Sequence, residues 1–147
     1  MRSDSISVAL LVHVLGAMVL VGGLATAATA GIVGWRDEAA GLRRFSYWTL
    51  LAVAFPGYIV MRIGAQWTAS KEHLDNLPSD PTWLGIGYVT ADAGAALLLI
   101  ALILGGIGLR RSRSGGGGRW LKASSVLATL LVAVYIVSVW AMGAKPT

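Results

Sequence analysis

The sequence predicts an all-α integral membrane protein, a four-helix bundle with an up-down-up-down arrangement and both termini outside. Three observations predict it. Hydrophobic residues make up 56% of the 147 residues and charged residues 13%, roughly half the charged share of a soluble domain. The apolar residues fall into four long blocks, as bilayer spans require. All six tryptophans lie near the ends of those blocks, where the amphipathic indole ring favours the lipid headgroups.

The four blocks define four expected spans within a single transmembrane domain, residues 1–147. Each exceeds the roughly 20 residues that cross a hydrocarbon core about 30 Å thick. At 1.5 Å per residue, Trp48 to Trp67 covers about 28 Å and Trp120 to Trp140 about 30 Å. The spans are expected at residues 5–33, 45–68, 83–109 and 120–142, with a flexible basic loop at residues 110–119.

Lysine and arginine residues predict the direction of the spans, because they concentrate in cytoplasmic loops. Eight lie in the loops after the first and third spans, and three lie on the other face. The face with eight is expected to be cytoplasmic, so both termini and the loop of residues 69–82 face outward. The eight are Arg36, Arg43, Arg44, Arg110, Arg111, Arg113, Arg119 and Lys122.

The net charge of +5 therefore reflects membrane orientation, and no nucleic-acid partner is expected. The expected location is a bacterial inner or plasma membrane. The expected partners are the lipid bilayer and either further copies of the chain or a larger membrane complex. The basic loop RRSRSGGGGR reads as a stop-transfer signal with a linker, and binding of anionic headgroups is the alternative.

Several function classes lack the residues that they need. The chain has no cysteine, so disulfides, thiolate metal sites and a cysteine nucleophile are excluded. No Ser–His–Asp spacing, HExxH motif or dinucleotide fingerprint is visible, which argues against an enzyme. The GGGG run follows a basic loop and not a strand, so it does not predict a phosphate-binding loop.

Small residues and one proline predict how the helices pack. Small side chains let membrane helices approach closely, and two runs of them recur at a spacing of four. Pro56 removes one backbone hydrogen bond from the second span and is expected to kink it. The runs are Gly23, Ala27 and Gly31 in the first span and Gly87, Ala91 and Ala95 in the third.

Ionisable residues inside the spans form the candidate site, because such groups are costly in hydrocarbon. From the span ends, His13 lies roughly 12 Å deep, Arg62 roughly 8 Å and Asp92 roughly 13 Å. All three fall in the outer half of the bilayer, and Tyr135 reaches a similar depth. We expect Arg62 to pair with Asp92, either to fix helix register or to serve a substrate or proton. Outward snorkelling of Arg62 is the alternative.

His13 is the candidate metal ligand, because a neutral imidazole binds haem iron or copper and also relays protons. No second histidine lies in a span, so bis-histidine haem within one subunit is excluded. The candidate co-ligands are Met61, Met142 near the outer end of the fourth span, and His13 of a second subunit. Met18 is poorly placed, because it lies on the same helix as His13. Two other interpretations stay open, a proton relay and a histidine satisfied by Asp92 or Tyr135.

Two further sequence patterns each allow a functional interpretation and a simpler structural one. The outer loop contains His73 together with Glu72, Asp75 and Asp80. These side chains either form a weak surface metal site or are simply solvated. The run ATAATA in the first span resembles a signal-peptide cleavage site. The long apolar stretch and Asp4 argue instead for a retained first span.

The motif LLVHVLGAMVLVGG, with His13 before Gly22–Gly23, resembles the opening helix of bacterial copper-resistance D-type membrane proteins. The stretches PGYIVMRIGAQW, WLGIGYVTADAG and VWAMGAKP are similar to a family of bacterial four-span proteins without an assigned activity. The first resemblance implies a metal-related role for His13. The second implies the four-span fold.

Three functions are therefore open. A small haem- or metal-binding protein would use His13 and lose its metal on His13→Ala. A proton-coupled transport component would use His13, Arg62 and Asp92 as a polar path. An accessory or structural subunit of a membrane complex would use the same residues only for packing.

Overall fold

The structure is a computed structural model that describes residues 2–71, 73 and 82–143. It contains four helices long and apolar enough to cross a membrane, and no strand occurs in the part of the chain described. The all-α fold class is confirmed, and so is the expected number of helices that could cross a membrane. The elements are α1 (Arg2–Arg36), α2 (Ala40–Thr49), the π-helical turn η1 (Leu50–Ala54), α3 (Phe55–Lys71), α4 (Thr82–Ser112) and α5 (Gly118–Gly143).

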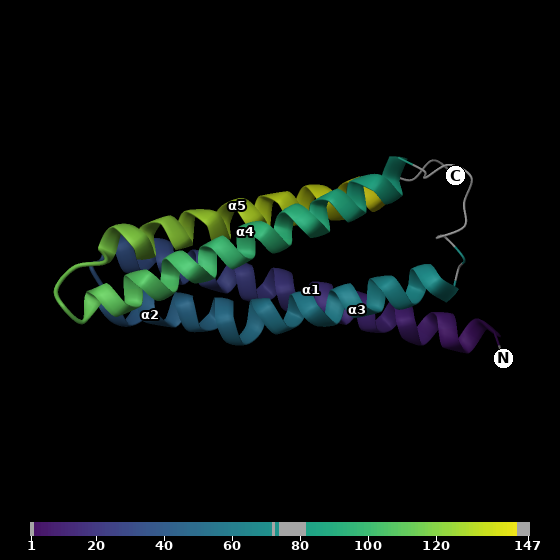
Figure 1. The fold of residues 1–147 in the computed structure, drawn as a ribbon, viewed down its shortest axis with the longest axis horizontal. Coiled ribbons are helices and arrows are strands. Elements are labelled where there is room, and N and C mark those ends of the chain that lie inside the picture. Colours follow the sequence, from purple (N-terminus) through teal and green to yellow (C-terminus); the bar gives the residue numbers. More distant parts are fainter. Residues whose placement is uncertain (1, 72, 74–81, 144–147) are drawn as a thin grey trace.

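The second membrane-length helix is composite, since α2, η1 and α3 follow one another without a break over Ala40–Lys71. α3 packs along α1, α4 packs along α5, and α1 also contacts α5 (Figure 1). α3 and α4, in contrast, touch at few points. The α1–α2 and α4–α5 connections lie together at one end of the bundle, called the basic end below.

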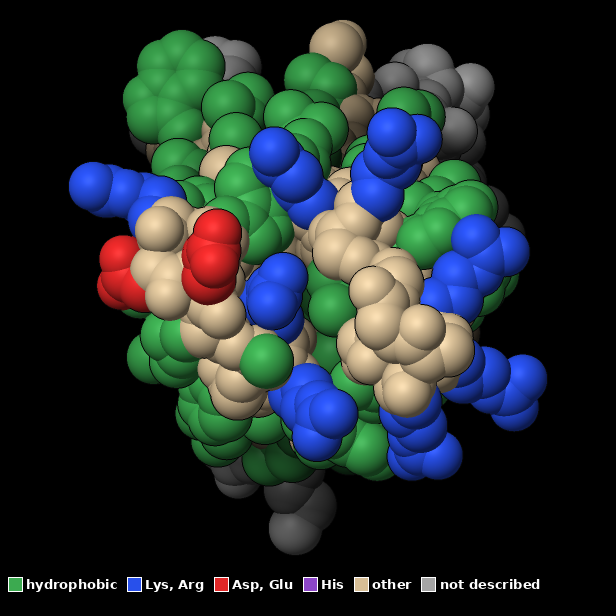
Figure 2. Space-filling view, turned by 90° about the vertical axis from the view of Figure 1, so that its left-hand side faces the viewer, with side chains coloured by type: hydrophobic (Ala, Val, Ile, Leu, Met, Phe, Trp, Pro, Cys, Tyr) green, Lys and Arg blue, Asp and Glu red, His purple; other side chains and the backbone are tan. Residues whose placement is uncertain are grey.

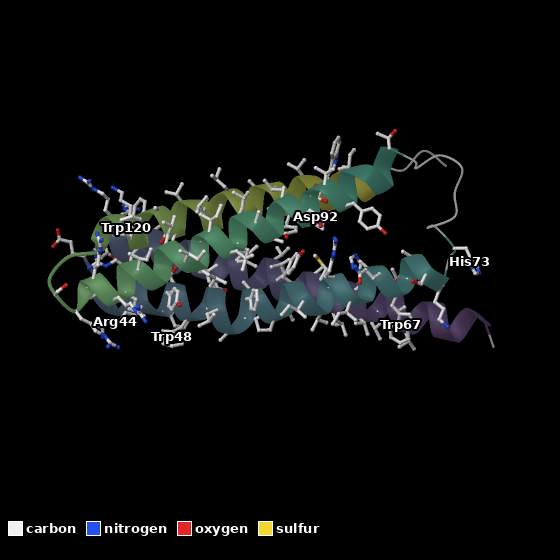
Figure 3. The ribbon with its side chains drawn as sticks, viewed as in Figure 1. Arg44, Trp48, Trp67, His73, Asp92 and Trp120 are labelled. Carbon is white, nitrogen blue, oxygen red and sulfur yellow. The ribbon has the colours of Figure 1, made fainter. Side chains whose placement is uncertain are left out.

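Most of the helical surface faces outward and is apolar. Between 28% and 33% of the residues in the most apolar stretch of each span are buried. Large apolar side chains are exposed on every span, among them Met18, Val53, Val89 and Ile136. Trp48 and Trp120 lie toward the basic end and Trp67 toward the opposite end (Figure 3). This distribution is typical of helices that face lipid.

The π-helical turn lies directly before Pro56, the residue expected to distort the second span. The N–H of Phe55 donates to the carbonyl of Leu50, five residues earlier. Proline has no N–H, and its ring presses on the carbonyl four residues before it. A wider turn relieves that contact, so the distortion takes the form of a π-helical turn at the predicted place.

Glycines bring the backbones of α1 and α3 into contact. A Cβ on Gly16 would collide with the backbone of Met61, and a Cβ on Gly64 would collide with the backbone of His13. Farther along the same pair of helices, Gly57 lies against Leu20 in the same way. Such close approach is how helices associate in lipid. It also fixes the distance between His13 and the turn of α3 that carries Met61.

The predicted small-residue runs have different outcomes. Gly23, Ala27 and Gly31 are all buried, and Gly31 lies against Ser125 of α5, so the first run is a contact face. The residues Gly87, Ala91 and Ala95 are half-buried, and the carbonyl of Ala91 accepts a hydrogen bond from Tyr58 of α3. The buried face of α4 lies beside them, at Gly94, Leu98, Ala101, Gly105 and Gly108.

Buried serines join the helices through hydrogen bonds. Ser46 on α2 donates to the carbonyl of Ala27 on α1 at 2.7 Å. Ser124 on α5 donates to the carbonyl of Ala101 on α4 at 2.8 Å. A helix carbonyl retains a second lone pair, so each bond satisfies a buried hydroxyl without breaking the helix.

Candidate functional site

The centre of the candidate site is an ion pair between α3 and α4. Nη2 of Arg62 lies 2.8 Å from Oδ1 of Asp92, so the expected pairing is present. The guanidinium carbon of Arg62 also lies 5.8 Å from the centre of the Tyr88 ring. The side chain of Arg62 is 27% exposed and that of Asp92 is 67% exposed. The arginine is thus mostly covered by the bundle, while the carboxylate is largely exposed.

A hydrogen bond links the same two helices one turn away. The hydroxyl of Tyr58 on α3 donates to the carbonyl of Ala91 on α4 at 3.2 Å. The neighbouring residue on α4 is Asp92. Since α3 and α4 otherwise make few contacts, polar interactions hold them together at this level.

A hydrogen bond holds one ring nitrogen of His13 and leaves the other nitrogen available to the site. Its Nδ1 lies 3.0 Å from the backbone carbonyl oxygen of Met61. A carbonyl oxygen only accepts, so Nδ1 carries the hydrogen and Nε2 of the neutral ring keeps its lone pair. The described residues offer Nε2 no hydrogen-bond partner, and the His13 side chain is half-buried. It can therefore act as a base or as a metal ligand.

The partner of His13 differs from those weighed from the sequence. It is the Met61 carbonyl, and not Asp92 or the Tyr135 hydroxyl. Because Arg62 follows Met61 in the chain, this hydrogen bond also ties His13 to the turn that carries the ion pair. The three ionisable residues from α1, α3 and α4 consequently share one region of the bundle.

The side chain of Met61, an expected co-ligand, is 7% exposed and belongs to the hydrophobic core. The hydrogen bond with His13 is made by the Met61 backbone. Met18 is 66% exposed on the outer surface of α1. No group of three or more His, Asp or Glu residues gathers in the described part of the chain. Within one subunit, His13 is thus the strong ligand available in the spans.

Tyr135 contributes a buried hydroxyl on α5. The hydroxyl is enclosed and has no partner among the described residues. It lies where a side chain on Gly94 of α4 would be, two residues from Asp92. An enclosed donor without an acceptor is costly, and the missing side chain at Gly94 is what makes room for this hydroxyl.

His73 is exposed in the loop at the end opposite the basic end (Figure 3). Its expected companions Glu72, Asp75 and Asp80 lie outside the described residues.

Two site residues, Tyr58 and Tyr88, were missed by the sequence analysis. Tyr58 precedes Arg62 by four residues, and Tyr88 precedes Asp92 by four. Residues at this spacing share one helix face. The repeated aromatic-then-charged spacing on two spans is the signal that could have found them.

Together the side chains offer an imidazole nitrogen, a guanidinium–carboxylate pair and three tyrosines, contributed by four helices. Such a set can bind a metal-containing or polar ligand, or transfer a proton. No protein-family model, curated protein or solved structure matches the chain.

Proposed function

We propose that this protein is a small multi-pass membrane protein that binds a metal-containing ligand, haem or copper, through Nε2 of His13. The observation that carries the proposal is the hydrogen bond from Nδ1 of His13 to the Met61 carbonyl. Histidines that bind metals almost always donate their other N–H to a carbonyl or carboxylate, which orients the ring and raises the basicity of the ligating nitrogen. The resemblance of the first span to copper-resistance D-type proteins supports the same assignment.

The ligand count limits which metal complexes fit. Haem iron needs one protein ligand when the opposite position stays open, and His13 supplies one. Copper needs more, so His13 of a second copy would complete a copper site. Arg62 lies one residue from Met61 and would pair with a carboxylate of haem, in place of Asp92 or beside it.

The membrane orientation belongs to the same proposal. Eight of the basic residues are at one end, so that end is cytoplasmic and the helices run up, down, up and down with both termini outside. His13 and Asp92 then lie in the outer half of a bacterial inner membrane. A cysteine at Ser114 should react with a membrane-impermeant maleimide only after permeabilisation, and labelling in intact cells would reverse this orientation.

The test of the ligand is metal analysis of the full chain, purified in detergent from cells supplied with iron and copper. We expect close to one metal per chain or per pair of chains, with a Soret band if the ligand is haem. His13→Ala should remove it, because no other span residue offers an imidazole. His73→Ala is the matched control and should retain the metal. Equal metal content in His13→Ala and the unmodified protein would refute the proposal.

A second candidate is favoured by the exposure of Asp92. A carboxylate on a membrane span normally faces protein or water, and this one is 67% exposed in the single chain. That exposure supports a subunit of a larger assembly, in which another chain covers the outer side of α4.

A further inference from the structure

A cavity of about 310 Å³ opens at the basic end of the bundle, away from the site of His13. It lies between the start of α2, the end of α4 and the loop into α5. Figure 2 views this end, where lysine and arginine side chains surround the loop and the acidic side chains lie to one side. Its lining includes Arg43, Arg44, Ser112, Gly115, Gly116 and Gly118.

Arg43 crosses the cavity with a donor that nothing in the described chain satisfies. Its Cγ lies 2.9 Å from where a Cβ on Gly34 of α1 would be. Its Nη1 lies 3.7 Å from the corresponding position on Gly118 of α5. Its Nε is enclosed and has no hydrogen-bond partner among the described residues. Because Nε is closed to solvent, a ligand in the cavity would instead meet the Nη groups of Arg43, which are not among the enclosed atoms.

The charges of Arg43 and Arg44 are also not neutralised within the described part of the chain. The acidic residues of this end, Asp37 and Glu38, are exposed. The ion pair found among the described residues joins Arg62 to Asp92, far from this cavity. Two arginines thus face one cavity without a carboxylate partner.

The start of α5 also borders the cavity, through Gly118 and Leu121. The amides of Trp120 and Leu121 both donate to the carbonyl of Gly117. Those of Gly118 and Arg119, the first two helical residues, have no acceptor within the helix. Free amides at a helix start attract an anion. Gly115 and Gly117 have φ of 82° and 100°, a backbone that suits glycine and leaves the loop without side chains over the cavity.

Aromatic residues place this end at headgroup depth. The charged atom of Lys122 lies 4.6 Å from the centre of the Trp35 ring, and that of Arg111 lies 5.2 Å from the Trp120 ring. Indole rings favour the bilayer interface. A phosphate at that depth would meet the two arginines and the α5 amides together.

We propose that this cavity binds a phosphate group, supplied by an anionic lipid headgroup or by free phosphate. A phosphate carries the negative charge and the several acceptor oxygens that two guanidinium groups and backbone amides require. The binding is independent of any ligand at His13.

The test is native mass spectrometry of the detergent-purified full chain, mixed with equal amounts of phosphatidylglycerol and phosphatidylcholine. We expect selective retention of phosphatidylglycerol. The double variant Arg43→Gln/Arg44→Gln should reduce it at least about tenfold, since charge-assisted bonds are lost. The matched control is Arg110→Gln/Arg113→Gln, which removes the same charge from exposed residues outside the cavity and should change retention less than about twofold.

Added inorganic phosphate separates the two sources. Binding of millimolar phosphate by the full chain, lost in the cavity variant, would identify free phosphate as the ligand. Retention of lipid unaffected by phosphate would identify the headgroup. Equal losses in both double variants would mean general surface attraction and would overturn the proposal, as would no selectivity for either probe. Circular dichroism of each variant, with Arg43→Lys as a milder change, separates lost binding from lost folding.

Discussion

Arg62 and Asp92 each carry a charge that hydrocarbon does not solvate, so their pairing determines whether α3 and α4 hold together. The bond is 2.8 Å long, but Asp92 is largely exposed, which weakens the contribution of the pair compared with a fully buried one. Removing one partner leaves the other charge without its counter-ion. Without Asp92, the side chain of Arg62 can snorkel toward the headgroups.

We therefore expect Asp92→Ala to lower the free energy of unfolding by about 1–2 kcal/mol, between the values typical of intramembrane hydrogen bonds and of broken buried ion pairs. The charge-reversed double variant Arg62→Asp/Asp92→Arg should recover most of that loss, because it restores the pair in the opposite sense. Unfolding by dodecyl sulfate in detergent micelles, followed by circular dichroism, measures both. If the double variant is as unstable as the sum of the single changes, the two charges do not stabilise each other.

The sequence predicted helix packing only in part, because a run of small residues marks a contact face but not the helix that it meets. Four apolar blocks predicted four spans, and Pro56 predicted the distortion, because composition and proline act locally. The fully buried face of α4, which includes Gly94 and Leu98, was not predicted, since Gly and Ala occur all around that helix and local spacing does not say which side meets α5. Tyr58 and Tyr88 were missed because their roles depend on how α3 and α4 face each other. His13 was singled out from the sequence, but its hydrogen-bond partner is a backbone carbonyl, which a sequence does not mark.

Gly16 tests the α1–α3 contact that positions His13. A methyl group at Gly16 would collide with the backbone of Met61, whereas one at Gly22 on the same helix meets nothing within 4 Å. Gly16→Ala should lower the free energy of unfolding by about 1–3 kcal/mol, as overpacking does. Gly22→Ala should be neutral or stabilising by up to about 1 kcal/mol through helix propensity. The same unfolding experiment compares them, and equal stability of the two variants would show that the close contact is dispensable.

The complete bundle has an unequal arrangement, with α1 packed on α3, α4 on α5, and few contacts along the side where α3 faces α4. Asp92 lies on that side, and Val89, one turn earlier on α4, is 68% exposed. A lipid-facing carboxylate is unfavourable, so burial of this side by another chain would stabilise the protein in the membrane. A second copy would also bring a second His13 into the assembly.

The chain has no cysteine, so a single introduced cysteine reports directly on this side of the bundle. If a second copy covers it, Asp92→Cys should form a disulfide-linked dimer in native membranes under mild oxidation, because the two thiols lie at one interface. Ile136→Cys, exposed on α5, is the matched control and should stay monomeric on a non-reducing gel. A disulfide-free Asp92→Cys that reacts readily with a water-soluble maleimide would contradict the dimer. Asp92 would then face water, and the proton-coupled function would gain support because the carboxylate could exchange protons with the outside.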